Sequence, residues 1–146
     1  MNSEERSVSL KIVTVDDSPI IVERLKAMLN EMNNVEFAGN ATTISSALAL
    51  ISQQKPNVVI LDIHLEADMP AANGISLLTI LRKRGTAMKI IMLTNLNEPQ
   101  YRNTCLFMGA NYFLDKSNEF EKLPETLLEI IQAETAHQAL NRYEQQ

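Results

Sequence analysis

The chain has only one cysteine among its 146 residues, Cys105, which excludes an intramolecular disulfide bond. It also has no uninterrupted apolar run long enough to cross a membrane, and Met1 to Arg6 is polar with no apolar signal-peptide core behind it. A free cysteine suits a reducing compartment. We therefore expect a cytoplasmic protein that makes no contact with a membrane.

Basic residues are also not in excess. Thirteen Lys and Arg residues stand against eighteen Asp and Glu residues, and the resulting net charge of -5 argues against DNA binding by bulk charge. The one basic cluster, Arg82-Lys83-Arg84, ends a predicted helix, where cations complement the helix dipole. No internal repeat, low-complexity tract or linker interrupts the chain, so its 45% hydrophobic and 21% charged residues indicate one globular domain.

Short apolar runs rich in β-branched residues alternate with stretches of helical periodicity. The predicted strands cover residues 10–15, 35–39, 57–62, 88–94 and 111–114. The predicted helices follow them, with Ser18, Thr42 or Thr43, and Ser117 as N-caps and Pro19 and Pro99 in first turns. Because parallel neighbours need helical crossovers, five strands and five helices in alternation predict an α/β fold with a doubly wound parallel sheet. We expect the domain at 8–134, an N-terminal tail at 1–7, and a helical or frayed extension at 135–146.

Polar residues stand where the predicted strands end. Strand one ends in Asp16-Asp17, strand three in Asp62, strand four in Thr94, and strand five just before Lys116. In a parallel sheet these ends share one edge, where ligands of open α/β sheets bind. Three carboxylates brought together repel each other unless a cation neutralises them, and oxygen ligands of this kind suit Mg²⁺. A threonine hydroxyl and a lysine ammonium can hold phosphoryl oxygens, so the edge is predicted to bind Mg²⁺ and accept phosphate.

These motifs, taken together, resemble the receiver domain of two-component response regulators. The resemblance rests on Val15-Asp16-Asp17-Ser18, Leu61-Asp62, Leu93-Thr94 and the run from Gly109 to Lys116, in order and with family-like spacing. It implies a flavodoxin-like three-layer sandwich with a five-stranded parallel sheet in the order 2-1-3-4-5. The chain looks like a stand-alone, chemotaxis-type receiver, with no second domain after the fifth helix.

The resemblance also implies roles for the acids. Asp62 would be the phosphoacceptor, taking a phosphoryl group from a phosphohistidine of a histidine kinase or histidine phosphotransfer protein. Asp17 and Asp62 would bind Mg²⁺, Asp16 would act mainly through a metal-bound water, and the backbone carbonyl of His64 would add a ligand. Such a protein is not an enzyme, apart from catalysing its own phosphorylation and dephosphorylation.

Thr94 and Lys116 would bind the phosphoryl oxygens after transfer, and Phe113 occupies the switch-aromatic position. Movement of Thr94 would let Phe113 turn inward and alter the face formed by helix 4, strand 5 and helix 5. That face would control an unknown downstream protein, and it also allows a homodimer.

Several features depart from the family pattern, and three of them concern the loops around the predicted site. The loop at 66–72 is longer than usual, Asn95 follows Thr94 where the family favours Ala or Gly, and Ser117 replaces the usual proline after Lys116. We expect Asn95 to narrow access to the phosphate. An alternative is therefore a constitutive pseudo-receiver, a protein-binding module that is never phosphorylated. A metal-dependent phosphohydrolase is disfavoured, because such enzymes place an acid two residues past the nucleophile, where this chain has His64.

Overall fold

Five parallel strands form one sheet, in the order β2-β1-β3-β4-β5, in the computed structural model, which describes residues 8–66 and 71–144. The strands are β1 (Leu10–Val15), β2 (Val35–Ala41), β3 (Val58–Leu61), β4 (Lys89–Thr94) and β5 (Tyr112–Asp115). The helices are α1 (Pro19–Asn30), α2 (Ile44–Gln54), α3 (Gly74–Lys83), α4 (Pro99–Phe107), the 3₁₀ turn η2 (Phe120–Lys122) and α5 (Leu123–Glu144). The predicted flavodoxin-like fold and strand order are confirmed.

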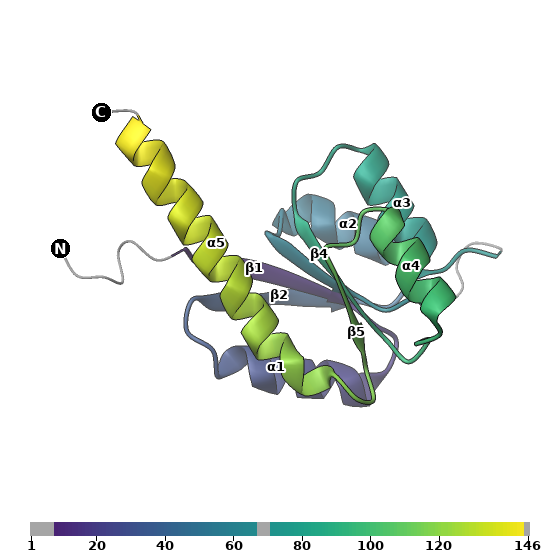
Figure 1. Cartoon of the computed structure of the whole chain (residues 1–146). Coiled ribbons are helices and arrows are strands. Elements are labelled where there is room, and N and C mark those ends of the chain that lie inside the picture. The colour runs from purple at the N-terminus through teal and green to yellow at the C-terminus, as the bar shows by residue number, and fades with distance from the viewer. Residues whose placement is uncertain (1–7, 67–70, 145–146) are drawn as a thin grey trace.

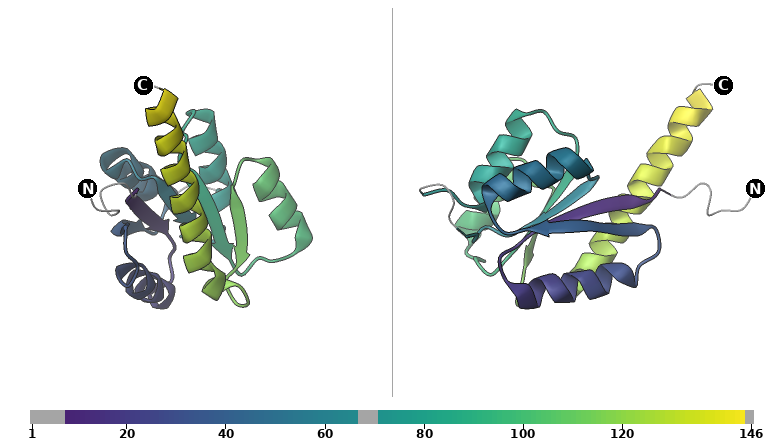
Figure 2. Two further views of the ribbon diagram at one scale, coloured as in Figure 1. Left: turned by 60° about the vertical axis from the view of Figure 1, so that its left-hand side comes forward. Right: turned by 180° about the vertical axis from the view of Figure 1, so that it is seen from behind.

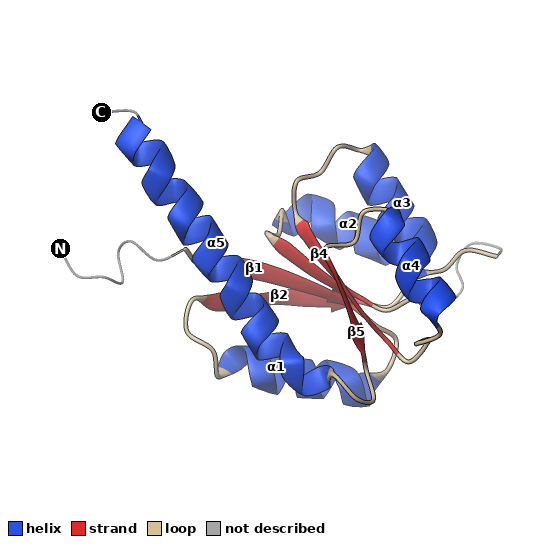
Figure 3. Ribbon diagram, viewed as in Figure 1, coloured by secondary structure: helices blue, strands red, loops and turns tan. Residues whose placement is uncertain are grey.

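The helices lie in two layers, one on each face of the sheet (Figures 1 and 3). Helices α1 and α5 cover one face, and α2, α3 and α4 cover the other, as the views from the side and from behind also show (Figure 2). The central strands are apolar on both sides: in β3, Val58 and Ile60 pack toward α1 and α5, while Val59 and Leu61 pack toward the opposite layer. Such two-sided burial explains the continuous apolar run that the sequence shows at this strand.

Side-chain caps fix where the first three helices begin. The Ser18 side chain accepts a hydrogen bond from the backbone N–H of Ile21, and Pro19 occupies the first helical position. Thr43, rather than Thr42, caps α2 in a reciprocal pair with Ser46. These caps satisfy backbone donors that a helix start would otherwise leave unpaired, and they end the loops that follow the strands.

The prediction that Ser117 caps the last helix is wrong. Its backbone N–H bonds the Asp115 carboxylate at 3.0 Å and its hydroxyl donates to Asn95 at 2.9 Å, so neither group serves a helix start. The chain instead passes through η2, and α5 begins at Leu123.

Helix α5 continues past the sheet, so its last turns project from the fold (Figure 1). Its buried residues end at Ile131, and Leu140 and Tyr143 are exposed on the projecting part. The predicted extension at 135–146 is thus helical as far as Glu144. The predicted tail at 1–7 and residues 145–146 lie outside the described residues. No helix in the described part of the chain has the length and apolar content needed to cross a membrane.

Arg82 does more than complement a helix dipole. Its guanidinium donates to the backbone oxygens of Gly109 at 2.9 Å, Thr86 at 3.0 Å and Met88 at 2.8 Å. A fourth bond reaches the side-chain oxygen of Asn111 at 2.9 Å. This one half-buried side chain therefore ties α3 to the loops that lead into β4 and β5.

Replacing Arg82 should destabilise the domain far more than replacing its neighbour. Arg82→Met removes four hydrogen bonds from a charged donor and leaves carbonyl groups unpaired, so we expect a loss of about 2–4 kcal/mol of unfolding free energy. Lys83→Met, at an exposed position on the same helix, should change it by less than about 0.5 kcal/mol. Urea unfolding of the two variants measures the change in unfolding free energy. Equal losses in both would contradict the role of Arg82 in connecting α3 to the two loops.

Candidate functional site

Three acidic side chains gather at the carboxyl edge of the sheet. Asp16 and Asp17 follow β1, and Asp62 follows β3, its neighbour in the sheet. The backbone N–H of Asp62 donates to Val15 at 3.0 Å, so parallel pairing sets the acid beside the end of β1. One ligand oxygen from each of the three acids lies within 4.8 Å of the others, a spacing that one divalent cation can bridge.

Gly74 lets α3 start directly against the chain that carries Asp62. Its backbone N–H donates to Ile63 at 2.7 Å, while Asn73 caps the helix from the preceding position. A Cβ atom at Gly74 would overlap the Asp62 carbonyl oxygen and lie 2.8 Å from Cα of Ile63. The glycine is therefore required by close backbone approach, and this packing fixes the position of Asp62.

Lys116 joins two of the acids inside the protein. Its Nζ lies 2.8 Å from Asp16 and 2.9 Å from Asp62, and all three side chains are almost fully buried. Burial alone would lower the pKa of Lys116, but its hydrogen bonds to Asp16 and Asp62 outweigh that effect and raise the pKa. Burial raises the pKa of Asp16, in spite of the bond from Lys116. Three carboxylates against one ammonium leave the cluster short of positive charge, which favours a cation.

Asp17 and His64 form the open side of the cluster. The Asp17 side chain is 24% exposed, and His64, 79% exposed, places its Nδ1 at 3.9 Å from the Asp17 carboxylate. The backbone N–H of His64 donates to Asp62 at 3.3 Å. A cation could thus be reached from solvent beside Asp17, while the role of the His64 carbonyl as a ligand stays a prediction. Of the longer loop, Asp68 lies outside the described residues and Glu66 is exposed.

Thr94 and Phe113 lie on the neighbouring strands. Thr94 ends β4 and is buried, its hydroxyl accepts a bond from the N–H of Leu96, and its carbonyl accepts one from the N–H of Lys116. Phe113 pairs with Met92 across β4 and β5, and its ring is only 4% exposed. The ring is thus already inside the fold, with the Arg102 guanidinium 5.7 Å from its centre.

The cluster opens into a cavity of about 240 Å³. Asp17, Asp62, His64, Thr94 and Lys116 all contribute to its wall, so the structure brings these predicted residues to one solvent-accessible hollow. Its remaining lining residues are Ser18, Asn95 and Leu96.

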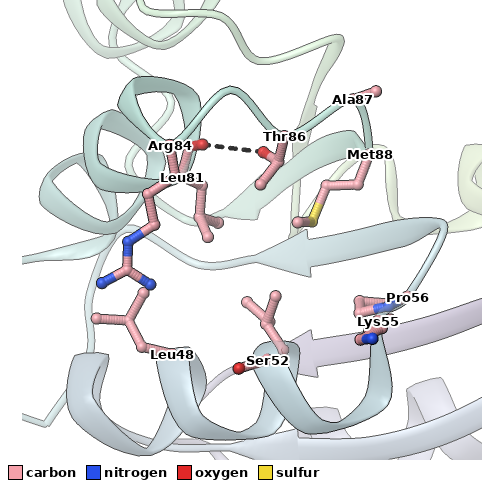
Figure 4. A pocket seen from close by; sticks show the side chains of 10 residues that line it. Leu48, Ser52, Lys55, Pro56, Leu81, Arg84, Thr86, Ala87 and Met88 are labelled. Carbon is pink, nitrogen blue, oxygen red and sulfur yellow. Dashed lines mark hydrogen bonds between the residues drawn. The ribbon is translucent and has the colours of Figure 1, made fainter.

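A larger cavity of about 420 Å³ lies at the opposite edge, between α2 and α3 near the start of β3 (Figure 4). Leu48, Leu81 and Met88 give it apolar walls, with Lys55 and Arg84 also lining it. It contains no acid and none of the predicted site residues, so we place the chemistry at the smaller cavity.

A polar network that the sequence does not predict lies beside the site. Asp115, the last residue of β5, accepts hydrogen bonds from Asn97 at 3.0 Å, Asn118 at 2.8 Å and the backbone N–H of Ser117 at 3.0 Å. In the sequence, only Asn95 and Asn97, shortly after Thr94, indicate such a network. The network joins the loop after β4 to the loop after β5, which carry Thr94 and Lys116.

Comparison with known proteins identifies relatives of this chain. A family model described as the response regulator receiver domain matches residues 12–128. The transcriptional regulatory protein MalR of Bacillus subtilis is 30% identical over 118 residues, which are 81% of this chain and 48% of MalR. The DNA-binding transcriptional activator EvgA of Escherichia coli is 32% identical over 107 residues, 73% of this chain and 50% of EvgA. The chain therefore spans about half the length of these curated relatives.

Solved structures agree on the fold. The response regulator domain of Thermotoga maritima CheB superposes with a TM-score of 0.72 at 25% identity, covering 88% of this chain and 97% of that one. The signal receiver domain of the putative response regulator NarL from Mycobacterium tuberculosis gives 0.75 at 23% identity, covering 86% and 98%. None of these relatives bears out the narrower prediction of a stand-alone, chemotaxis-type protein, which stays a prediction.

The Asp115 network should make stability depend on pH in acid. Side-chain bonds from Asn97 first, then the Ser117 N–H and Asn118, hold the pKa of Asp115 below its ordinary value of 3.8. A lowered pKa stabilises the folded state fully above 3.8, and the effect is lost as pH falls through the folded-state pKa. Asp115→Asn should therefore unfold at lower urea than the wild type at pH 7, with a gap that narrows below pH 3.8.

The control for this comparison is Glu121→Gln, at an exposed position, which should leave the urea midpoint at pH 7 nearly unchanged. A gap between wild type and Asp115→Asn that stays constant down to acid pH would contradict a role for the ionised carboxylate.

Proposed function

Because the chain belongs to the response regulator receiver domain family, we propose that Asp62 accepts a phosphoryl group from a phosphohistidine of a histidine kinase or histidine phosphotransfer protein. One observation carries the proposal. The Asp62 carboxylate lies in a solvent-accessible cavity with the buried Lys116 ammonium 2.9 Å away and two further acids beside it. A nucleophile, a cation-binding set and a fixed positive charge thus meet in one place.

The acids fit Mg²⁺, since hard oxygen ligands shared between carboxylates and phosphate are its usual surroundings. Asp17 and Asp62 would hold the ion directly and Asp16 mainly through water, with the His64 carbonyl as a further ligand. Bound there, Mg²⁺ would neutralise charge on the incoming phosphoryl group.

The transfer itself needs few protein groups. An Asp62 carboxylate oxygen attacks phosphorus, the phosphorus–nitrogen bond of the phosphohistidine breaks, and its electron pair returns to the histidine nitrogen. The product is an acyl phosphate on Asp62. The Lys116 ammonium, which lies beside the Asp62 carboxylate, would then pair with the phosphoryl oxygens. The Thr94 hydroxyl would donate a hydrogen bond to one of these oxygens.

A rearrangement around Thr94 would pass the signal on. The Thr94 hydroxyl accepts a hydrogen bond from the Leu96 N–H, and its movement to donate its own proton to the phosphoryl group would shift the loop after β4 and the packing of Phe113. Phe107 on α4 is 88% exposed and Leu128 on α5 is 48% exposed, so both helices present an apolar side chain to solvent. We propose that the face formed by α4, β5 and α5 binds a downstream protein or a second copy of the chain, with no DNA contact by the receiver itself.

Incubation with acetyl phosphate and Mg²⁺ tests the acceptor. Intact mass should rise by one phosphoryl group in the wild type, and the gain should disappear in Asp62→Asn and on removal of metal by a chelator. Thr104→Ala, an exposed change on α4, serves as the matched control and should label normally. If the folded wild type gains no mass with metal present, the chain is the constitutive pseudo-receiver instead.

The switch can be separated from the chemistry through Phe113. Phe113→Leu keeps an apolar side chain of similar size, so it should fold and take up the phosphoryl group at the wild-type rate. The amide chemical-shift changes that phosphorylation causes in α4 and α5 should shrink, because the aromatic ring no longer couples the two sites. Leu114→Ile, on the opposite face of β5, is the control. Unchanged shift differences in Phe113→Leu would exclude Phe113 as the switch.

A further inference from the structure

Two residues that depart from the family pattern contact each other beside the candidate site. The hydroxyl of Ser117 donates to the side-chain oxygen of Asn95 at 2.9 Å. Asn95 directly follows Thr94, and Ser117 directly follows Lys116. The bond therefore connects the loop after β4 to the loop after β5, next to Thr94 and Lys116, the two residues expected to hold the phosphoryl group.

A second bond holds the same loops together deeper in the fold. Asn97 donates to the Asp115 carboxylate at 3.0 Å, and Asp115 also fixes the backbone of Ser117. The loop after β4 is thus attached to the loop after β5 at two points. Because Asp115 orients Ser117 from below, the exposed Asn95–Ser117 bond forms between partners already in place, which reduces the entropy lost in making it.

The Asn95–Ser117 bond lies between two hollows. The cavity that contains Asp62 measures about 240 Å³, and a neighbouring hollow of about 280 Å³ contains Ser117, Arg24 and Phe120. Asn95 and Lys116 line both of them. Because they share these lining residues, the two hollows adjoin at the carboxyl edge of the sheet, with the Asn95–Ser117 pair where they meet. We call the two adjoining hollows the groove.

We propose that Asn95 and Ser117 form a bridge that restricts access to Asp62 and so discriminates between phosphoryl donors. With the bridge closed, small molecules reach Asp62 only through its own cavity, beside Asp17 and His64. A protein donor that docks over the groove can open the bridge with its own contacts, whereas a free acyl phosphate or water cannot. The statement about donors rests on the function proposed above, but the statement about access does not.

A thiol placed at the acceptor position measures access without any phosphoryl chemistry. In Asp62→Cys, the alkylation rate with iodoacetamide reports how often a small reagent reaches that position. The native Cys105 is fully buried, and burial raises its pKa to about 11, so it contributes little to the signal. Peptide masses identify which thiol is labelled. Comparison of the pH-independent maximal rates removes any effect on the pKa of the introduced thiol.

The bridge is tested by Asn95→Ala and Ser117→Ala, singly and together, in the Asp62→Cys chain. Loss of one hydrogen bond should raise the alkylation rate by about two- to tenfold in either single variant. Because both changes break the same bond, the double variant should be no faster than the singles. Ser117→Thr keeps the hydroxyl and should stay slow, as should Asn103→Ala, an exposed change on α4.

Single variants that react at the original rate would overturn the bridge. Increases in alkylation rate that multiply in the double variant would also overturn the bridge. Two side chains that obstruct the cavity independently need no hydrogen bond between them. The same substitutions with Asp62 intact should speed labelling by acetyl phosphate by a similar factor. If no chain takes up the phosphoryl group but the thiol results are as expected, the proposed function fails and the bridge stands.

Discussion

The contact of one buried ammonium group with two buried carboxylates governs this molecule. An ion removed from water is costly unless it is paired and hydrogen-bonded, and Lys116 meets that condition by bridging Asp16 and Asp62. The three residues come from the ends of β1, β3 and β5, so the pairing is satisfied only when the strands are assembled in register. The same arrangement that makes burial tolerable also brings Asp62, the proposed phosphoacceptor, next to a fixed positive charge.

Directed hydrogen bonds join the loops that follow β4 and β5 beside this cluster. The Asp115 carboxylate accepts hydrogen bonds from Asn97, Asn118 and the backbone N–H of Ser117. The N–H of Lys116 donates to the carbonyl of Thr94. Hydrogen bonds can exchange partners when a new charge arrives, whereas a close-packed core resists gradual deformation. A polar rim on a rigid apolar sheet therefore suits a site whose occupancy has to be communicated to a surface.

Features with a local signal in the sequence can be predicted from it. Two-sided apolar strands, caps such as Ser18, and acids at strand ends have local signals, and the sheet order followed from the family resemblance. Contacts between distant side chains have no such signal. Arg82 could not be told from its basic neighbours, because its four acceptors lie in other segments. The sequence around Ser117 predicts a helix cap, because serine is common before a helix, and it does not indicate Asn95, the actual partner, 22 positions away.

We propose that the three acids form a single site for a divalent cation beside Lys116. Titration of the metal-free protein with Mg²⁺ in a calorimeter tests it directly, in the wild type and in Asp17→Asn, which removes the most exposed of the three carboxylates. We expect the wild type to bind one ion and Asp17→Asn to bind it with markedly lower affinity. Binding that is absent from the folded wild type, or unchanged by Asp17→Asn, would contradict the proposed site.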